Sequence, residues 1–255
     1  AVVVWVGLAA AVLPPVGYDA HEYHLRIPEQ YLNNNGWVSF PYNVYGAFPM
    51  NVEMLYLWPL AGESPAGCTS INLLFALLTA LAVRQMGVLW GFGAYSLLAP
   101  LIFLSTGIVQ FLIVQADIDL ALSASAAVLL LAYERFRLEK RSIDAVMISL
   151  ALGFAFGCKY IAALSIGIPF LALLIVDCKQ IGWQRLWIPL GWAAMGAILL
   201  FLPWAIRNAL LYGNPFYPLL IDRLGGTPPI YQEAFRLAHA PNLDSFERIL
   251  RDFFV

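Results

Sequence analysis

Charged residues are scarce in this chain. Of its 255 residues only 12% are Asp, Glu, Lys or Arg, whereas 61% are hydrophobic, and the mean hydropathy is +0.75. A soluble domain typically carries about twice that charged fraction. A soluble core of this length could not bury so much apolar surface, so lipid must cover the excess. The composition therefore excludes an ordinary soluble domain and predicts a membrane protein.

Other absences narrow the class further. The apolar runs do not alternate with polar residues, which argues against a lipid-facing barrel. The net charge of −2 gives no reason to expect nucleic acid as a partner. Cys68, Cys158 and Cys178 lie in or beside apolar segments without CxxC spacing, so we expect small buried hydrophobes. The fold class that remains is all-α, a polytopic transmembrane helix bundle.

Stretches free of charge predict about seven spans, near 1–14, 66–88, 94–114, 118–134, 142–157, 160–176 and 186–205. A helix needs about 20 apolar residues to cross roughly 30 Å of hydrocarbon, and fewer if its ends snorkel. We expect one module over residues 1–255. Because the chain starts inside an apolar run and ends without a polar tail, we also expect it to be truncated at both ends.

The segment 48–62 decides the orientation of all later loops. It is short for a span and carries Asn51, Glu53 and Pro59. If it lies in the membrane interface, the Lys/Arg-rich loops, including 135–141, all fall on one side, as the positive-inside bias favours. We therefore predict long outer loops at 15–65 and 207–255, and short outer turns at 115–119 and 157–159. Interfacial helices are expected in the first, including an amphipathic one over 19–35.

Three groups of ionisable residues lie at this outer face. They are Asp19 with Glu22 and His24, Asp117 with Asp119, and Lys159 with Arg207.

Each residue also has a simpler explanation. Asp19 and Asp119 could cap helices, and Glu22 could lie on a solvated helix face. His24 alone is more often a packing residue, and Lys159 and Arg207 could be snorkelling anchors. Their gathering at one membrane face favours a functional site, since ionisable groups are costly there.

The combination has a definite chemistry. A DxD pair such as Asp117 and Asp119 supplies hard oxygen ligands for a divalent metal ion. A separate carboxylate, Asp19, can act as a general base for an incoming hydroxyl or amine. Lys159 and Arg207 can complement a phosphate whose charge grows in the transition state. Together they indicate group transfer from a lipid phosphate.

The order of these motifs resembles the polyprenyl-phosphate-dependent glycosyltransferases of the GT-C fold. It is closest in pattern to the protein O-mannosyltransferase and lipid A aminoarabinose transferase-like group. The resemblance covers essentially the whole chain, as the amino-terminal half of such an enzyme. Its motifs are P-P-x-x-Y-D-A-x-x-Y-H-L over 14–25, D-x-D-L-A over 117–121, G-x-K-Y over 157–160, P-W-x-x-R-N over 203–208 and G-N-P-x-Y-P over 213–218.

The resemblance implies a membrane enzyme of the cell envelope, in the bacterial inner membrane, with its active site on the periplasmic face. The donor would be a sugar on polyprenyl phosphate, the acceptor a lipid, glycan or protein, and the transfer inverting. Asp19, Glu22 and Asp119 would be catalytic. Substrate-binding residues would be His24, Lys159, Arg207 and Tyr217. The family often has two adjacent acids in the first loop, but here Ala20 follows Asp19, which leaves a metal ion at Asp117 and Asp119 an open expectation.

Two rivals belong to other classes. A transporter or lipid flippase without glycosyl transfer would use charges midway through the bilayer, at broken helices. A non-catalytic scaffold would use the same acids only as helix caps. Convergence of Asp19, Asp119 and Arg207 on one outer cavity would favour the enzyme over both alternatives. We also expect Asp244–Asp252 to form an amphipathic stretch over that site.

Overall fold

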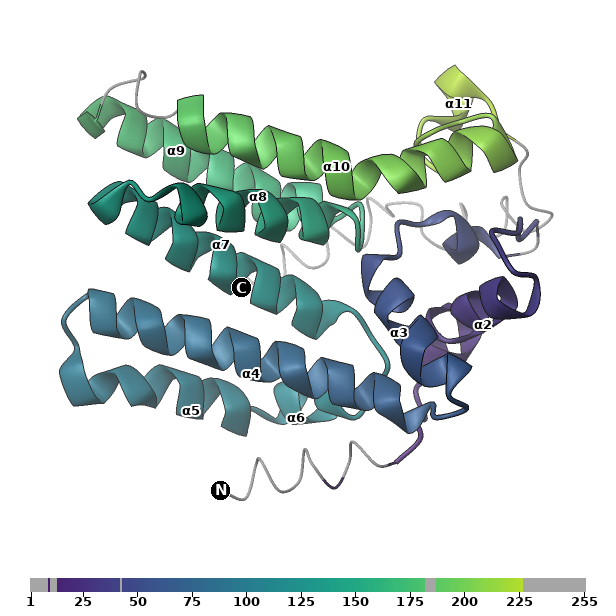
Figure 1. Cartoon of the computed structure of the whole chain (residues 1–255), viewed down its shortest axis with the longest axis horizontal. Helices are drawn as coiled ribbons and strands as arrows, with labels where there is room; N and C mark the ends of the chain where they lie inside the picture. Colours follow the sequence, from purple (N-terminus) through teal and green to yellow (C-terminus); the bar gives the residue numbers. More distant parts are fainter. Residues whose placement is uncertain (1–8, 10–12, 42, 182–186, 227–255) are drawn as a thin grey trace, which may run out of the picture.

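The computed structural model describes residues 9, 13–41, 43–181 and 187–226. The regular elements in this part of the chain are all helices, and it contains no strand (Figure 1). The predicted all-α class is therefore confirmed for these residues. The expected span at 1–14 lies almost wholly outside the described residues. The stretch Asp244–Asp252 lies wholly outside them.

Short helices come first, and longer helical segments follow, some of them made of two or three consecutive elements. The first group is η1 (Ala20–His24), α2 (Arg26–Asn33), η2 (Val44–Ala47) and α3 (Asn51–Ala61). The longer segments begin with α4 (Ala66–Leu89), then η3 (Gly93–Leu97), α5 (Leu98–Ser105), α6 (Gly107–Ile113) and α7 (Asp119–Glu139). They continue with α8 (Ser142–Phe156), η4 (Ala163–Gly167), α9 (Ile168–Ile181) and α10 (Trp187–Tyr212), and α11 (Ile221–Leu224) ends the described chain.

Two described helices are long and apolar enough to cross a membrane. They are α4 and the part of α10 from Gly191 to Tyr212, and η3–α5 with α6 makes a third if this bent pair is one span. Shorter apolar helices lie at 142–156 and 163–177. These findings support membrane association through two or three helices. The full set of about seven spans stays a prediction.

The span expected at 94–114 is broken rather than straight. Its two halves meet at an angle of 64° at Thr106, whose extended backbone (ψ 129°) ends α5. The hydroxyls of Ser105 and Thr106 both donate to the carbonyl of Ile102, and Gly107 follows with little helix propensity. The hydropathy pattern cannot register this break because both halves are apolar.

Close contact between α8 and α10 depends on glycine. A Cβ on Gly196 would collide with the backbone of Ser149, and a Cβ on Gly153 with the backbone of Gly196. Small residues at such crossings let helix backbones approach closely where lipid supplies no hydrophobic driving force. The packed helices α7, α8, α9 and α10 run side by side in Figure 1.

Both ends of α7 carry charge, but of different kinds. At its carboxy-terminal end Arg137 pairs with Asp177 (2.9 Å) and Arg135 with Asp144 (3.2 Å). At its amino-terminal end lie Asp119 and, two residues earlier, Asp117. This second end also holds η1, α2, α3 and α11, at the right of Figure 1, and we call it the acidic end.

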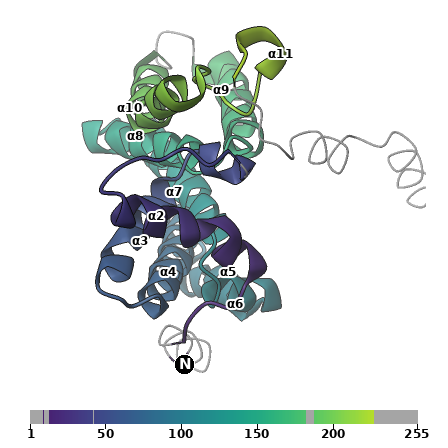
Figure 2. The same cartoon turned by 90° about the vertical axis from the view of Figure 1, so that its right-hand side faces the viewer.

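Asn51 fastens α3 across the acidic end. Its backbone N–H donates to the Gly157 carbonyl (2.7 Å), its amide to the Phe154 carbonyl (3.2 Å), and its side-chain oxygen accepts from the Trp204 indole (2.8 Å). Figure 2 views the molecule from this end, with α2 and α3 in front of α7. The helices expected within 19–35 and 48–62 are thus present as η1, α2 and α3. Their place in a membrane interface remains a prediction.

Candidate functional site

The centre of the acidic end is an imidazole between two carboxylates. His24 Nδ1 lies 2.6 Å from Glu53 Oε1, and its Nε2 lies 3.3 Å from Asp117 Oδ1. The first contact is a strong hydrogen bond, and the second is an ion-pair contact without good hydrogen-bond alignment. His24 is completely buried, and Glu53 nearly so. Three separate segments meet at this point: η1, α3 and the α6–α7 link, which is residues 114–118.

The two carboxylates control the charge of His24. Burial alone lowers the pKa of an imidazole, but Asp117 and Glu53 outweigh it and raise the pKa of His24 to about 9. Burial likewise acts to raise the pKa of Asp117, but the facing His24 and the Ile118 N–H hold it below its ordinary value. Near neutral pH the pair is therefore an imidazolium facing an ionised Asp117.

Buried polar side chains set the position of Asp117. The Tyr56 hydroxyl donates to the Asp117 carbonyl (2.7 Å), and the Asn72 amide donates to the Gln115 carbonyl. The Ile118 N–H donates to Asp117 Oδ1 (2.6 Å). These bonds satisfy backbone groups of the irregular α6–α7 link, which could not stay buried unpaired. The link is therefore held in one conformation.

A cavity of about 250 Å³ with a mixed polar and apolar lining opens beside Asp117. Asp19 lines the same cavity and is exposed to solvent. Gln115 lines it too, and its buried Oε1 accepts no hydrogen bond from the described residues. Asp19 begins η1 without accepting a side-chain capping bond, so the capping explanation for this residue fails. The cavity wall therefore offers a series of hydrogen-bond acceptors.

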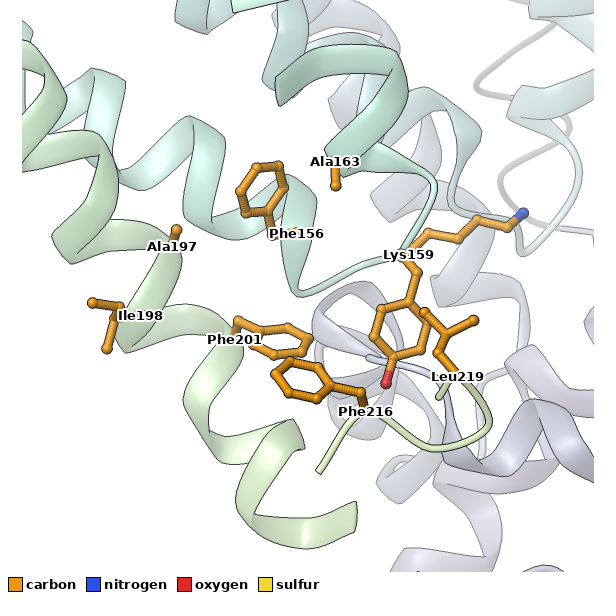
Figure 3. A pocket seen from close by; sticks show the side chains of 9 residues that line it. Phe156, Lys159, Ala163, Ala197, Ile198, Phe201, Phe216 and Leu219 are labelled. Atoms are coloured by element: carbon orange, nitrogen blue, oxygen red, sulfur yellow. The ribbon is translucent and has the colours of Figure 1, made fainter. Parts of the chain in front are cut away.

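Lys159 connects this cluster to a second cavity. That cavity, of about 380 Å³, is almost entirely apolar, and its lining includes Phe156, Tyr160, Phe201, Phe216 and the stem of Lys159. Figure 3 shows the Lys159 ammonium pointing away from the rings. Its charge acts on both Asp117 and Asp119. One side chain thus reaches from the apolar cavity towards the acids.

The structure brings together part of the predicted set. Asp19 and Asp117 share a cavity wall, and Asp119 lies within electrostatic reach of both and of Lys159. His24, expected to bind substrate, lies at the centre of the cluster but is closed to solvent. Three other predicted residues lie elsewhere.

Arg207 does not face the cavities and is completely buried. Its guanidinium donates to Tyr31 Oη (3.0 Å), to the Phe48 carbonyl (2.8 Å) and to Asn208 Oδ1 (2.9 Å), and it packs over the Trp204 ring. Its expected role towards a donor phosphate gains nothing from this position and stays a prediction. Protein acceptors around a buried guanidinium replace the water and phosphate that an exposed one would bind.

Glu22 and Tyr217 are also engaged by the protein. The Glu22 carboxylate and carbonyl both accept from the Asn43 amide (3.3 and 3.2 Å). Tyr217 is 1% exposed and stacks on Tyr212, and its carbonyl accepts from Tyr160 (3.0 Å). Their predicted catalytic and substrate-binding roles gain nothing from these positions.

A metal ion does not fit the acid pair in this arrangement. Among the described residues no three His, Cys, Asp or Glu side chains are grouped as metal ligands. Asp117 Oδ1 already accepts from Ile118 and faces a charged imidazole. Repulsion from that imidazolium would disfavour a second cation at the same oxygen.

Sequence reasoning missed Glu53, Tyr56 and Gln115 as members of the site. Glu53 did carry a signal, because a carboxylate in an otherwise apolar helix at a membrane face is a functional hypothesis by default. Tyr56 and Gln115 carried none, since aromatic and amide side chains are ordinary in such segments. Comparison with known proteins adds no further assignment: no family model, no curated protein and no solved structure matches this chain.

Proposed function

We propose that this protein is a membrane glycosyltransferase that moves a sugar from a polyprenyl-phosphate donor to an acceptor at the acidic end of its helix bundle. The observation that carries the proposal is Lys159. Its stem lines an apolar cavity, and its ammonium acts on Asp117 and Asp119. A long isoprenoid tail needs an apolar wall, and its phosphate needs a cation at the end of that wall.

The chemistry follows from the neighbouring groups. An acceptor hydroxyl or amine in the cavity beside Asp19 gives its proton to Asp19 as it attacks the anomeric carbon. The new bond forms on the face opposite the phosphate, and the bond from the anomeric carbon to the phosphate oxygen breaks. The electron pair leaves with polyprenyl phosphate, whose growing charge Lys159 stabilises. The product is a sugar of inverted configuration on the acceptor.

The proposal also specifies the membrane location of the protein and its partners. The donor tail lies among the helices, membrane lipids surround them, and the acceptor is a lipid, glycan or protein. The acidic end faces the periplasm of a bacterial inner membrane. About seven spans, with α2 and α3 in the interface, complete the arrangement. A transporter or flippase remains the alternative, and it would bind the donor without transferring the sugar.

Donor binding and transfer test the proposal separately. The chain in nanodiscs is mixed with undecaprenyl phosphate and examined by native mass spectrometry, then assayed with labelled polyprenyl-phosphate sugars. We expect Lys159→Gln to weaken binding at least tenfold, whereas Lys140→Gln, at the other end of α7, leaves it unchanged. Asp19→Asn should keep binding and abolish transfer.

Two results would count against the enzyme. Equal weakening by both lysine variants would show non-specific attraction of phosphate to positive charge. Specific binding at Lys159 with no transfer from any labelled donor would favour the flippase.

A further inference from the structure

The contacts of His24 have a consequence for the charge at the site. Both ring nitrogens face carboxylate oxygens, at 2.6 Å from Glu53 and 3.3 Å from Asp117. A neutral imidazole has one donor nitrogen and one acceptor nitrogen. In the neutral form one nitrogen lone pair would therefore point at an anionic oxygen, which is repulsive. Only the doubly protonated ring suits both neighbours.

The other groups around the ring do not change the expected double protonation of His24. Tyr23, on the same element, lies against the His24 ring at a centroid distance of 4.0 Å and carries no charge, since burial and nearby acids raise its pKa. Lys159 is the cation that acts on Asp117 from the next loop. The charged groups in contact with His24 are Glu53 from α3 and Asp117 from the α6–α7 link, and the charge of His24 also acts on Asp119. One buried carboxylate, Glu53, and one at a cavity wall, Asp117, thus share one imidazole.

We propose that His24 is the resident cation of this site, an imidazolium that holds Glu53 and Asp117 together and occupies the place a divalent metal ion would need. In sites built on paired acids, a bound cation usually balances the carboxylates and fixes their direction. Here the imidazolium of His24, on η1, balances the carboxylates and fixes their direction. His24 is then a positioning residue for Asp117, and the acid pair works without a metal.

The expected effect of His24 on sugar transfer rests on the proposed function. The charge of His24 and the affinity of the site for a metal ion do not. Two measurements on the wild-type full chain in nanodiscs therefore decide the inference even if no donor is ever found.

The first measurement is ¹⁵N NMR of histidine-labelled protein at pH 7. The chain has three histidines, so His24 can be assigned by elimination from His21→Gln and His239→Gln variants. We expect both nitrogens of His24 to be protonated at this pH. A neutral tautomer at pH 7 would overturn the inference.

The second measurement is Mn²⁺ binding followed by electron paramagnetic resonance, in wild type and in Asp117→Asn. We expect no bound Mn²⁺ that depends on Asp117. One equivalent bound by wild type and absent from Asp117→Asn would show that the acids form a metal site after all.

Transfer activity supplies the third readout. Wild type stripped with EDTA should keep its rate within twofold, and loss of the rate with recovery on adding Mg²⁺ or Mn²⁺ would contradict the inference. His24→Gln should lower kcat at least tenfold with little change in KM for the donor. His21→Gln is the matched control, because His21 is exposed and its ring bonds only to the Pro15 carbonyl (2.9 Å) among described residues. If His24→Gln does not fold, the wild-type measurements above still decide.

Discussion

At the residue scale, this site is built from ionisable groups that the protein has removed from water. His24 is 0% exposed, Glu53 2% and Arg207 0%. Groups in such positions must find partners, because a buried unpaired charge costs several kcal/mol. Each of the three does find one, and the partner determines what the residue can do. His24 belongs to the acid cluster, whereas Arg207 belongs to the packing of α10.

The raised pKa of His24 predicts a pH-dependent stability. Its folded-state pKa of about 9 lies above the ordinary value of 6.5, so the charged ring stabilises the fold. This contribution is complete below pH 6.5 and is lost as the pH rises through about 9. The difference in melting temperature between wild type and His24→Gln should therefore shrink across that window. A difference that stays constant from pH 6 to pH 10 would show that His24 is neutral in the folded protein.

Arg207→Gln should destabilise the fold without acting on donor binding. The change removes charged hydrogen bonds to Tyr31 and Phe48, and each such bond contributes about 1.5–3 kcal/mol. We expect a loss of about 3 kcal/mol in denaturation of the detergent-solubilised protein. Arg26→Gln, at an exposed position of α2, should stay within about 0.5 kcal/mol. An unchanged stability with weakened polyprenyl-phosphate binding would restore the phosphate role for Arg207.

At the element scale, backbone contact between helices places the site. Lys159 and Tyr160 follow the end of α8 after two residues, and α8 packs on α10 through Gly153 and Gly196. The cavity lined by Phe156, Lys159 and Phe201 therefore depends on the spacing of these two helices.

Gly196→Ala should push α8 and α10 apart. The added Cβ would meet the backbone of Ser149, which cannot turn away as a flexible side chain could. Overpacking of this kind costs about 1–3 kcal/mol, and a lower midpoint of thermal unfolding would measure it. Gly191→Ala, on the same helix with nothing within 4 Å of the new Cβ, is the matched control and should be neutral or slightly stabilising. Equal effects of the two changes would show that the close approach is not important for stability.

On the scale of the whole molecule, two charged ends are separated by apolar helices. The acidic cluster lies at the start of α7 and the Arg135–Asp144 and Arg137–Asp177 pairs lie near its end. Across this distance α4, with 24 residues, extends about 36 Å, which is enough to cross the hydrocarbon core. The two ends therefore suit opposite faces of a membrane.

Labelling of single cysteines tests this arrangement. Asn35→Cys follows α2 at the acidic end, and Lys140→Cys lies between α7 and α8 at the other end. Cys68 and Cys158 are buried, and Cys178 is replaced by Ala in both variants. In intact cells a membrane-impermeant maleimide should label Asn35→Cys and should label Lys140→Cys only after lysis. Labelling of both from outside would reject the proposed topology.

The sequence alone determined the helical class and the position of most helices, because long runs without charge allow little else. It also singled out Asp19, Asp117, Asp119 and Lys159, since charged side chains between apolar spans are few. The break at Thr106 and the fate of Arg207 were decided by tertiary structure. Arg207 and Lys159 look alike in sequence, each at the edge of an apolar segment, and only packing separates them. Arg207 meets Tyr31, 176 residues away, whereas the charge of Lys159 acts on Asp117 and Asp119. The same holds for His24, whose charge comes from Glu53 and Asp117, two residues far along the chain that only the folded protein brings to either side of one ring.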